Sequence, residues 1–210
     1  MLIRNCLTER KNLTVVYPHE TIQQVIQRMD NHLSLPCTDE DNRFLGFVSK
    51  RRIFEAFLAE SKRGTSFDEF ETWSVSICID PSVATLQVDD PFEKTIDIII
   101  RHPFVAIVDD DQLIGIVKRG DVNAVLSVAF ANNIDSQRLL IGTAEVEGAL
   151  ERLFNVIHRL EINVITAIPF DAGPNSLNRR ILLKVSKTEK FPQLIQQLEK
   201  SGFLIVQATP

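Results

Sequence analysis

Apolar and polar positions near the start of the chain follow the periods of strands and helices in turn. An apolar run to Val16 predicts a strand, and a helical pattern opens around Glu20 and Thr21. A strand ending at Thr38, the acidic turn DEDN and the strand Phe44–Val48 come next, and a second helical pattern closes the stretch. This order predicts one β-α-β-β-α unit.

A later stretch repeats the same order of elements. Pro91 stands near the start of its first helix, as Pro18 does in the earlier stretch. The turn DDDQ takes the place of DEDN, and the strand Leu113–Val117 follows it. Self-similarity of this kind indicates two tandem copies of one structural unit.

The repeat sets the expected domain limits. We expect the copies to span residues 1–60 and 77–131, with a connecting arm at 61–76 between them. The arm is charged but carries aromatic side chains that we expect to dock it in part, namely Phe67, Phe70 and Trp73.

The remaining residues, 136–210, follow a different pattern. A strand, a helix from about Val146 to Leu160 and a strand are followed by a further strand, helix and strand. The order βαββαβ predicts a separate small domain, so the whole chain falls in the α/β (α+β) class.

Each tandem copy carries half of one short motif where its last strand gives way to a helix. GFVSKRR, Gly46 to Arg52, has the hydroxyl of Ser49 but an arginine three residues later. GIVKRGD, Gly115 to Asp121, has the acid but a lysine at the hydroxyl position. A hydroxyl and an acid at this spacing form a helix capping box in many proteins without any ligand.

The tandem copies, with SLPCTD before the turn and these motifs after it, resemble a pair of CBS domains. The resemblance covers about residues 1 to 130. It implies a compact pseudo-symmetric pair that binds an adenine nucleotide in the cleft between two sheets. In the family, the hydroxyl contacts phosphate, the acid contacts the ribose, and the pair is not catalytic.

The C-terminal pattern resembles an ACT domain, through its element order, the letters Glu147-Gly148-Ala149-Leu150 and the closing SGFLIV. The resemblance implies a ferredoxin-like module that binds amino acids or mediates pairing. A dimerising or transmitting role without a ligand stays open as the alternative.

Cations crowd the helix starts of both motifs. Lys50, Arg51 and Arg52 stand in the first turn after Ser49, where the helix dipole disfavours positive charge, and Lys118 has no acceptor with which to cap a helix. Phosphate binding beside the backbone N–H groups explains these cations better than a solvated basic rim does.

The exchanges between the motifs suggest how a nucleotide would be held. Asp121 can accept from ribose hydroxyls and Lys118 can attract phosphate, whereas Arg52 cannot accept a hydrogen bond. Two basic motifs near one pseudo-twofold axis suit a ligand with two phosphates, which favours cyclic di-AMP; AMP, ADP and ATP stay open. CBS pairs with an ACT-like tail resemble cyclic-di-AMP-binding proteins of Gram-positive bacteria.

The expected nucleotide-binding residues form two groups. The polar candidates are Ser49, Lys50, Arg52, Lys118, Arg119 and Asp121. The wall residues implied by the family resemblance are Val15, Leu35 and Pro36 at one site and Ala84, Val105 and Ala106 at the other.

Composition excludes several other functions. The chain has 210 residues, is 44% apolar and carries a formal charge of −5, which gives no general attraction to nucleic acid or anionic lipid. No apolar run reaches membrane-spanning length and no signal peptide is apparent, so we expect a cytoplasmic protein. Two of the three cysteines stand in apolar strand-like runs, which predicts buried thiols, and no disulfide framework is expected.

Catalysis and metal binding find no support in the motifs. The four histidines share no metal-ligand spacing, and the acidic runs Asp39–Asp41 and Asp109–Asp111 are predicted to be hairpin turns rather than calcium loops. Nucleophile-elbow, Walker and dinucleotide fingerprints are missing. We therefore predict a non-enzymatic sensor without a metal or cofactor, its adenine nucleotide being a regulatory ligand.

Two further hypotheses remain. The chain could sense an amino acid or other metabolite through the ACT-like domain, with the CBS pair as a dimerisation platform. It could also be a ligand-free interaction protein whose basic residues meet an acidic partner. A homodimer is expected under every hypothesis because edge strands and apolar helix faces need cover, and any effector protein is unknown.

Overall fold

The computed structural model describes residues 2–143, 147–173 and 179–210. The chain separates into two compact units, Met1–Asn123 and Ala124–Pro210, and helix α5 (Arg119–Ala129) contains the boundary. None of the helices in the described ranges has the length and apolar character needed to span a membrane.

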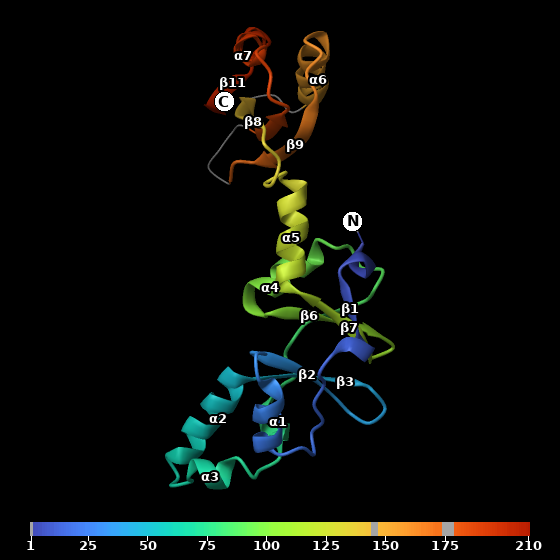
Figure 1. Ribbon diagram of the computed structural model, residues 1–210, viewed down its shortest axis with the longest axis vertical. Coiled ribbons are helices and arrows are strands. Elements are labelled where there is room, and N and C mark those ends of the chain that lie inside the picture. The colour runs from blue at the N-terminus through green and yellow to red at the C-terminus, as the bar shows by residue number, and fades with distance from the viewer. Residues whose placement is uncertain (1, 144–146, 174–178) are drawn as a thin grey trace. The chain divides into compact units, whose positions relative to one another are not determined.

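The first unit contains two sheets, one for each tandem copy (Figure 1). One has the order β2-β3-β4, and its strands are Ser34–Thr38, Phe44–Ser49 and Ile79–Asp80. The other has the order β1-β7-β6-β5, and its strands are Leu7–Glu9, Gln112–Lys118, Phe104–Asp109 and Thr85–Leu86. The copies therefore exchange edge strands: β1 belongs to the first copy but pairs with β7 of the second, and β4 belongs to the second copy but pairs with β3 of the first.

A glycine makes each exchanged strand fit. A Cβ on Gly46 in β3 would lie 2.2 Å from the carbonyl oxygen of Asp80 in β4. A Cβ on Gly115 in β7 would lie 2.3 Å from the carbonyl oxygen of Thr8 in β1. The two half-motifs therefore begin with glycine because a neighbouring backbone passes too close for any side chain.

Two helices cover the first sheet. They are α1 (Ile22–Met29) and α2 (Lys50–Ser61), and they bury apolar residues against the strands. The fully buried side chains of this core include Ile22, Val25, Met29, Cys37, Val48 and Phe70. The helix predicted to open around Glu20 and Thr21 is confirmed.

A complete capping box explains where α1 starts. The Oγ1 of Thr21 accepts from the backbone N–H of Gln24 at 3.2 Å, and Oε1 of Gln24 accepts from the N–H of Thr21 at 2.9 Å. We expect Thr21→Ala to lower the free energy of unfolding by about 1 kcal/mol, because one helix N–H loses its acceptor. Urea unfolding followed by Trp73 fluorescence would measure the loss, with Gln27→Ala, on the exposed face of α1, as the control.

The prediction of a strand that ends at Val16 is wrong. The structure has a single parallel bridge there, between Val16 and Cys37. The N–H of Val16 donates to Pro36 and the N–H of Thr38 donates to Val16, at 3.0 and 3.1 Å. Extension of a parallel ladder would need N–H groups from Pro36 on one side and Pro18 on the other, and proline has none.

The acidic turns are hairpins, as predicted. They connect β2 to β3 and β6 to β7, and Asn42, Asp110 and Asp111 take positive φ values there. The two turns also meet, because the N–H of Phe44 donates to Asp111 at 2.9 Å and the N–H of Leu113 donates to Asn42 at 2.9 Å. These bonds tie the two copies together at their hairpin tips.

The arm between the copies is folded. It contains helix α3 (Phe67–Phe70), and the ring of Phe67 contacts that of Phe57 in α2, with centroids 5.2 Å apart. Phe70 is fully buried and Trp73 packs against the same core. The prediction of an arm partly docked by its aromatic residues is confirmed. In the second copy, helix α4 (Lys94–Arg101) follows β5.

The second unit has the order βαββαβ. Its strands are β8 (Gln137–Thr143), β9 (Val164–Asp171), β10 (Arg179–Val185) and β11 (Leu204–Thr209), and its helices are α6 (Ala149–Arg159) and α7 (Phe191–Lys200). The sheet order β11-β8-β10-β9 is antiparallel throughout and ferredoxin-like, which confirms the predicted fold class. The predicted helix start at Val146 lies outside the described residues.

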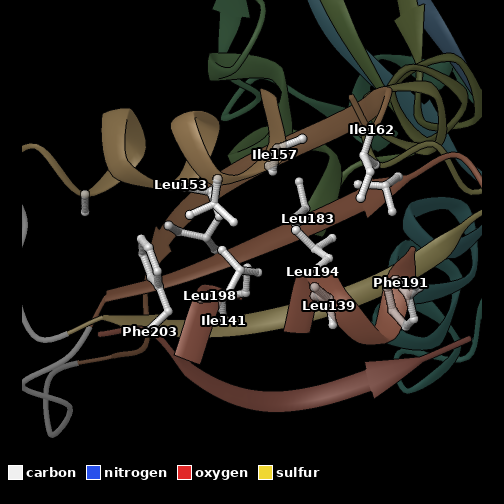
Figure 2. Close-up of a cluster of buried hydrophobic side chains, with 14 residues drawn as sticks. Leu139, Ile141, Leu153, Ile157, Ile162, Leu183, Phe191, Leu194, Leu198 and Phe203 are labelled. Carbon is white, nitrogen blue, oxygen red and sulfur yellow. The ribbon is translucent and has the colours of Figure 1, made fainter. Parts of the chain in front are cut away.

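The core of this unit lies between its sheet and its two helices. Figure 2 shows Leu153 and Ile157 of α6 and Leu194 and Leu198 of α7 pointing toward the sheet residues. Leu183, in the middle of β10, is fully buried there. Both helices show apolar residues at spacings of three and four, as a helix with one buried face requires.

Candidate functional site

Each half-motif satisfies a different half of a capping box. The Oγ of Ser49 caps α2 by accepting from the N–H of Arg52 at 3.1 Å. The Oδ2 of Asp121 accepts from the N–H of Lys118 at 3.3 Å, at the start of α5. The capping interpretation therefore accounts for the hydroxyl and the acid, but it leaves the cations at both helix starts unexplained.

Ile116, Lys118, Arg119 and Gly120 of the second motif line a cavity of about 290 Å³, here called the Lys118 cavity, whereas Asp121 does not line it. Leu35 and Pro36 of β2 belong to its wall, although they come from the first copy. Lys118 and Arg119 lie in the same wall, together with Thr14, Ser34, Phe104, Ile116 and Gly120. The cavity is therefore built by both copies.

The first motif lines a larger cavity of about 570 Å³, here called the Arg52 cavity. Its wall contains Ser49 and Phe47 of β3, from the first copy, and His102 and Pro103, from the second copy. Its cationic side chains outnumber its carboxylates: Lys50, Arg51, Arg52, Arg101 and Arg119 against Glu55 and Asp80. This cavity has the composition of an anion site.

The two cavities adjoin. Leu33, Ser34, Pro103 and Arg119 line both of them. An aromatic pair also connects them, because Phe47 of one cavity and Phe104 of the other have ring centroids 4.1 Å apart. The two half-motifs therefore face one continuous cleft between the copies.

Some of these cations are already engaged by the protein. Arg51 forms an ion pair with Glu55 at 2.7 Å. The Nζ of Lys50 donates to the carbonyl of Asp30 at 2.8 Å, and Arg119 donates to the carbonyl of His102 at 3.0 Å. These contacts hold three of the cationic side chains in place at the rim.

Three other cations differ from these. Among the residues that the structure describes, the side chains of Arg52, Arg101 and Lys118 make no hydrogen bond and no ion pair. All three line the cleft. They are the groups available to an anionic ligand.

Asp80 lies in the Arg52 cavity as an ionised carboxylate. Hydrogen bonds from Ser82 hold its pKa below the usual value, and the charges of Arg52 and His102 lower that pKa further. The hydroxyl and the N–H of Ser82 both donate to Oδ1, at 2.6 and 3.1 Å. Asp80 lies outside both sequence motifs and was not predicted as a site residue.

Comparison with known families identifies the fold of the first unit. The CBS domain matches residues 7–59 and 75–128, which together make up more than half of the chain. The chain belongs to the CBS-domain family. The two copies that build the cleft are thus CBS domains, as predicted. No curated protein matches the chain.

Solved structures agree with this assignment. A hypothetical conserved protein from Geobacillus kaustophilus is 23% identical with a TM-score of 0.55, over 60% of this chain and 96% of that one. A CbpB structure in complex with c-di-AMP is 12% identical with a TM-score of 0.53, over 64% and 91%. CBSX2 in complex with AMP is 23% identical with a TM-score of 0.50, over 60% and 97%. At these identities, the likeness shows a shared CBS fold.

The structure distributes the predicted wall residues unevenly. Leu35 and Pro36 line the Lys118 cavity, so residues of the first CBS copy meet the motif of the second. Val15, Val105 and Ala106 are at most 3% exposed, and none of them lines either cavity. Ala84 is exposed and borders neither cavity.

Several cleft residues carried no usable signal in the sequence. Arg101 and His102 end α4, and Asp80 stands in a two-residue strand, so none of them belongs to the motif. Phe47 and Phe104 are apolar strand residues like many others. They meet only because the two CBS copies face each other.

The cysteines are free, as predicted, and two are deeply buried. Burial raises the pKa of Cys37 to about 12 and that of Cys78 to about 11. Both thiols therefore stay protonated near neutral pH and act as small apolar side chains. In the described ranges, no group of three or more His, Cys, Asp or Glu residues could hold a metal ion.

Proposed function

We propose that the CBS pair is a non-catalytic sensor that binds an adenine nucleotide in the cleft, with cyclic di-AMP favoured over AMP, ADP and ATP. The bound state is passed to the C-terminal ACT-like unit or to a partner protein, because a ligand that prefers one conformation shifts the population toward it. The phosphates lie against Lys118 and Arg119 in one cavity and against Ser49, Lys50 and Arg52 in the other.

One observation carries the proposal. Arg52, Arg101 and Lys118, for which the described part of the chain provides no side-chain partner, line two cavities that share a wall. Arg52 and Lys118 stand at the starts of two helices, where the N–H groups and the helix dipole also favour an anion. A ligand with one phosphate for each cavity satisfies both ends of the cleft.

The apolar lining of the cleft supports a nucleotide in particular. Leu33 is 70% exposed and lines both cavities, so it offers apolar surface beside the cations, as purine bases and phosphates together require. The solved CBS structures include one bound to c-di-AMP and one bound to AMP. These ligands define the first compounds to test.

Calorimetric titration of the purified chain with cyclic di-AMP, AMP, ADP and ATP tests the proposal. We expect cyclic di-AMP to bind most tightly, with Arg52→Ala and Lys118→Ala each lowering its affinity about tenfold or more, since each removes a charged donor to phosphate. The affinity should also fall as the salt concentration rises.

Arg63→Ala is the matched control. Arg63 is an exposed arginine just after α2 that pairs with Glu60 and borders neither cavity, so its loss should leave the affinity unchanged. The proposal fails if none of the four nucleotides gives a binding isotherm with the wild-type chain. It also fails if Arg63→Ala weakens binding as much as Arg52→Ala does.

A further inference from the structure

The two exchanged edge strands place different side chains at equivalent positions of the two sheets. In the sheet of the first copy, Asp80 of β4 is opposite Phe47, two residues before Ser49. In the sheet of the second copy, Thr8 of β1 is opposite Ile116, two residues before Lys118, but Thr8 lines neither cavity. Phe47 and Ile116 each come directly after the glycine, Gly46 or Gly115, that the backbone of the edge strand approaches.

The carboxylate thus stands on a different element in each copy. The copy that has Asp121 in its motif has a threonine at the edge-strand position. The copy that has Arg52 in its motif has Asp80 at the edge-strand position. Each copy therefore keeps one carboxylate near its motif, supplied by a different element.

Asp80 retains an unused acceptor. Ser82 donates both of its hydrogen bonds to Oδ1, and within the described part of the chain no group donates to Oδ2. Arg52 and His102 influence the carboxylate by charge, yet no ion pair joins Asp80 to a cation among the described residues. The turn with Ser82 explains why an aspartate stands at this position, but it does not explain why the carboxylate also lines a cavity rich in cations.

We propose that Asp80 accepts a hydrogen bond from a ribose hydroxyl of a nucleotide in the Arg52 cavity, in place of the acid that the motif lacks. This inference rests on the proposed function. Ser49, Lys50 and Arg52, joined by Arg101, provide the phosphate contacts of this cavity, and Asp80 provides the sugar contact. The Arg52 cavity is therefore a complete nucleoside phosphate site, and the cleft holds a ligand with a nucleoside at each end.

The test compares ribose with deoxyribose. Cyclic di-AMP and AMP are each titrated by calorimetry beside their 2′-deoxy forms, into the wild-type chain and into Asp80→Asn. The asparagine keeps the shape and an oxygen for Ser82 but loses the charge. We expect the wild-type preference for the ribose form of cyclic di-AMP to shrink about tenfold in Asp80→Asn, with the affinity for the deoxy form nearly unchanged.

Two other variants complete the design. Glu55→Gln removes the other carboxylate of the same cavity, which already pairs with Arg51, and should keep the ribose preference. Asp80→Ala replaces Asp80→Asn as the test variant if Asp80→Asn melts at a lower temperature than the wild type. It should also lose the preference for ribose over deoxyribose.

The outcomes separate the two proposals. If the wild type prefers ribose and both Asp80 variants keep that preference, the role of Asp80 is overturned and nucleotide binding stands. The role is also overturned if the Asp80 variants weaken the ribose and deoxyribose forms equally. If no nucleotide binds to the wild type, both proposals fall.

Discussion

Replacing Gly46 by alanine is expected to destabilise the first unit by about 4 kcal/mol, through strained backbone and a steric clash together. The residue has φ of +139°, which L residues rarely adopt, and the added Cβ would lie 2.2 Å from the carbonyl oxygen of Asp80. The clash is with backbone, so it is relieved only if β4 moves away from β3. Nucleotide affinity should fall as well, because Asp80 and Ser49 border the same cavity.

Urea unfolding followed by the fluorescence of Trp73, the only tryptophan, measures this effect within the first unit. Gly115→Ala should be less damaging, since its Cβ would meet Thr8 at 2.3 Å but its φ is not positive. Gly120→Ala is the control, because its Cβ would meet no atom within 4 Å. A stability for Gly46→Ala within about 1 kcal/mol of the wild type would contradict the close approach of β4 to β3.

Leu183→Ala is expected to destabilise the second unit by about 3 kcal/mol, because it opens a cavity in a core that the surrounding strands and helices cannot fully refill. Leu183 is fully buried on the central strand β10, among side chains from both helices. Since the second unit has no tryptophan, hydrogen exchange of the β8 and β10 amides is the appropriate measurement.

Val206→Ala provides the comparison, because Val206 is 45% exposed on the edge strand β11 and should change the stability by less than about 0.5 kcal/mol. The Trp73 signal of the first unit should be unaffected by Leu183→Ala. An equal loss of stability in both units would mean that they unfold together, against the division at residue 123.

Local signals predicted much of the fold correctly. The capping box at Thr21, the two acidic hairpin turns and the helix after each motif all depend on residues a few positions apart. The Val16 strand was wrong for a reason that is also local, since Pro18 and Pro36 remove the N–H groups that a longer ladder needs. The domain limits, the individual nucleotide contacts and the ACT-like role of the second unit stay predictions.

The candidate site was accessible to sequence reasoning only in part. The cations at two helix starts could be recognised because helix dipoles disfavour them without an anion. The contribution of Arg101 and Asp80 could not be recognised from the sequence, since neither residue belongs to a repeated motif. Ala84, Val105 and Ala106 follow a family resemblance, and the structure brings none of them to the cleft surface.

Patterns among residues a few positions apart were enough to predict two tandem copies, a third βαββαβ segment, free buried cysteines and two basic helix starts. The tertiary structure alone decided that β1 and β4 each pair with the sheet of the other copy, that Leu35 and Lys118 line one cavity, and that Asp80 lines the cavity of the motif that lacks its acid. The physical reason is that strand exchange and the packing of two copies join residues far apart in sequence. Such pairings depend on which surfaces bury well together, and no local period of the sequence records that choice.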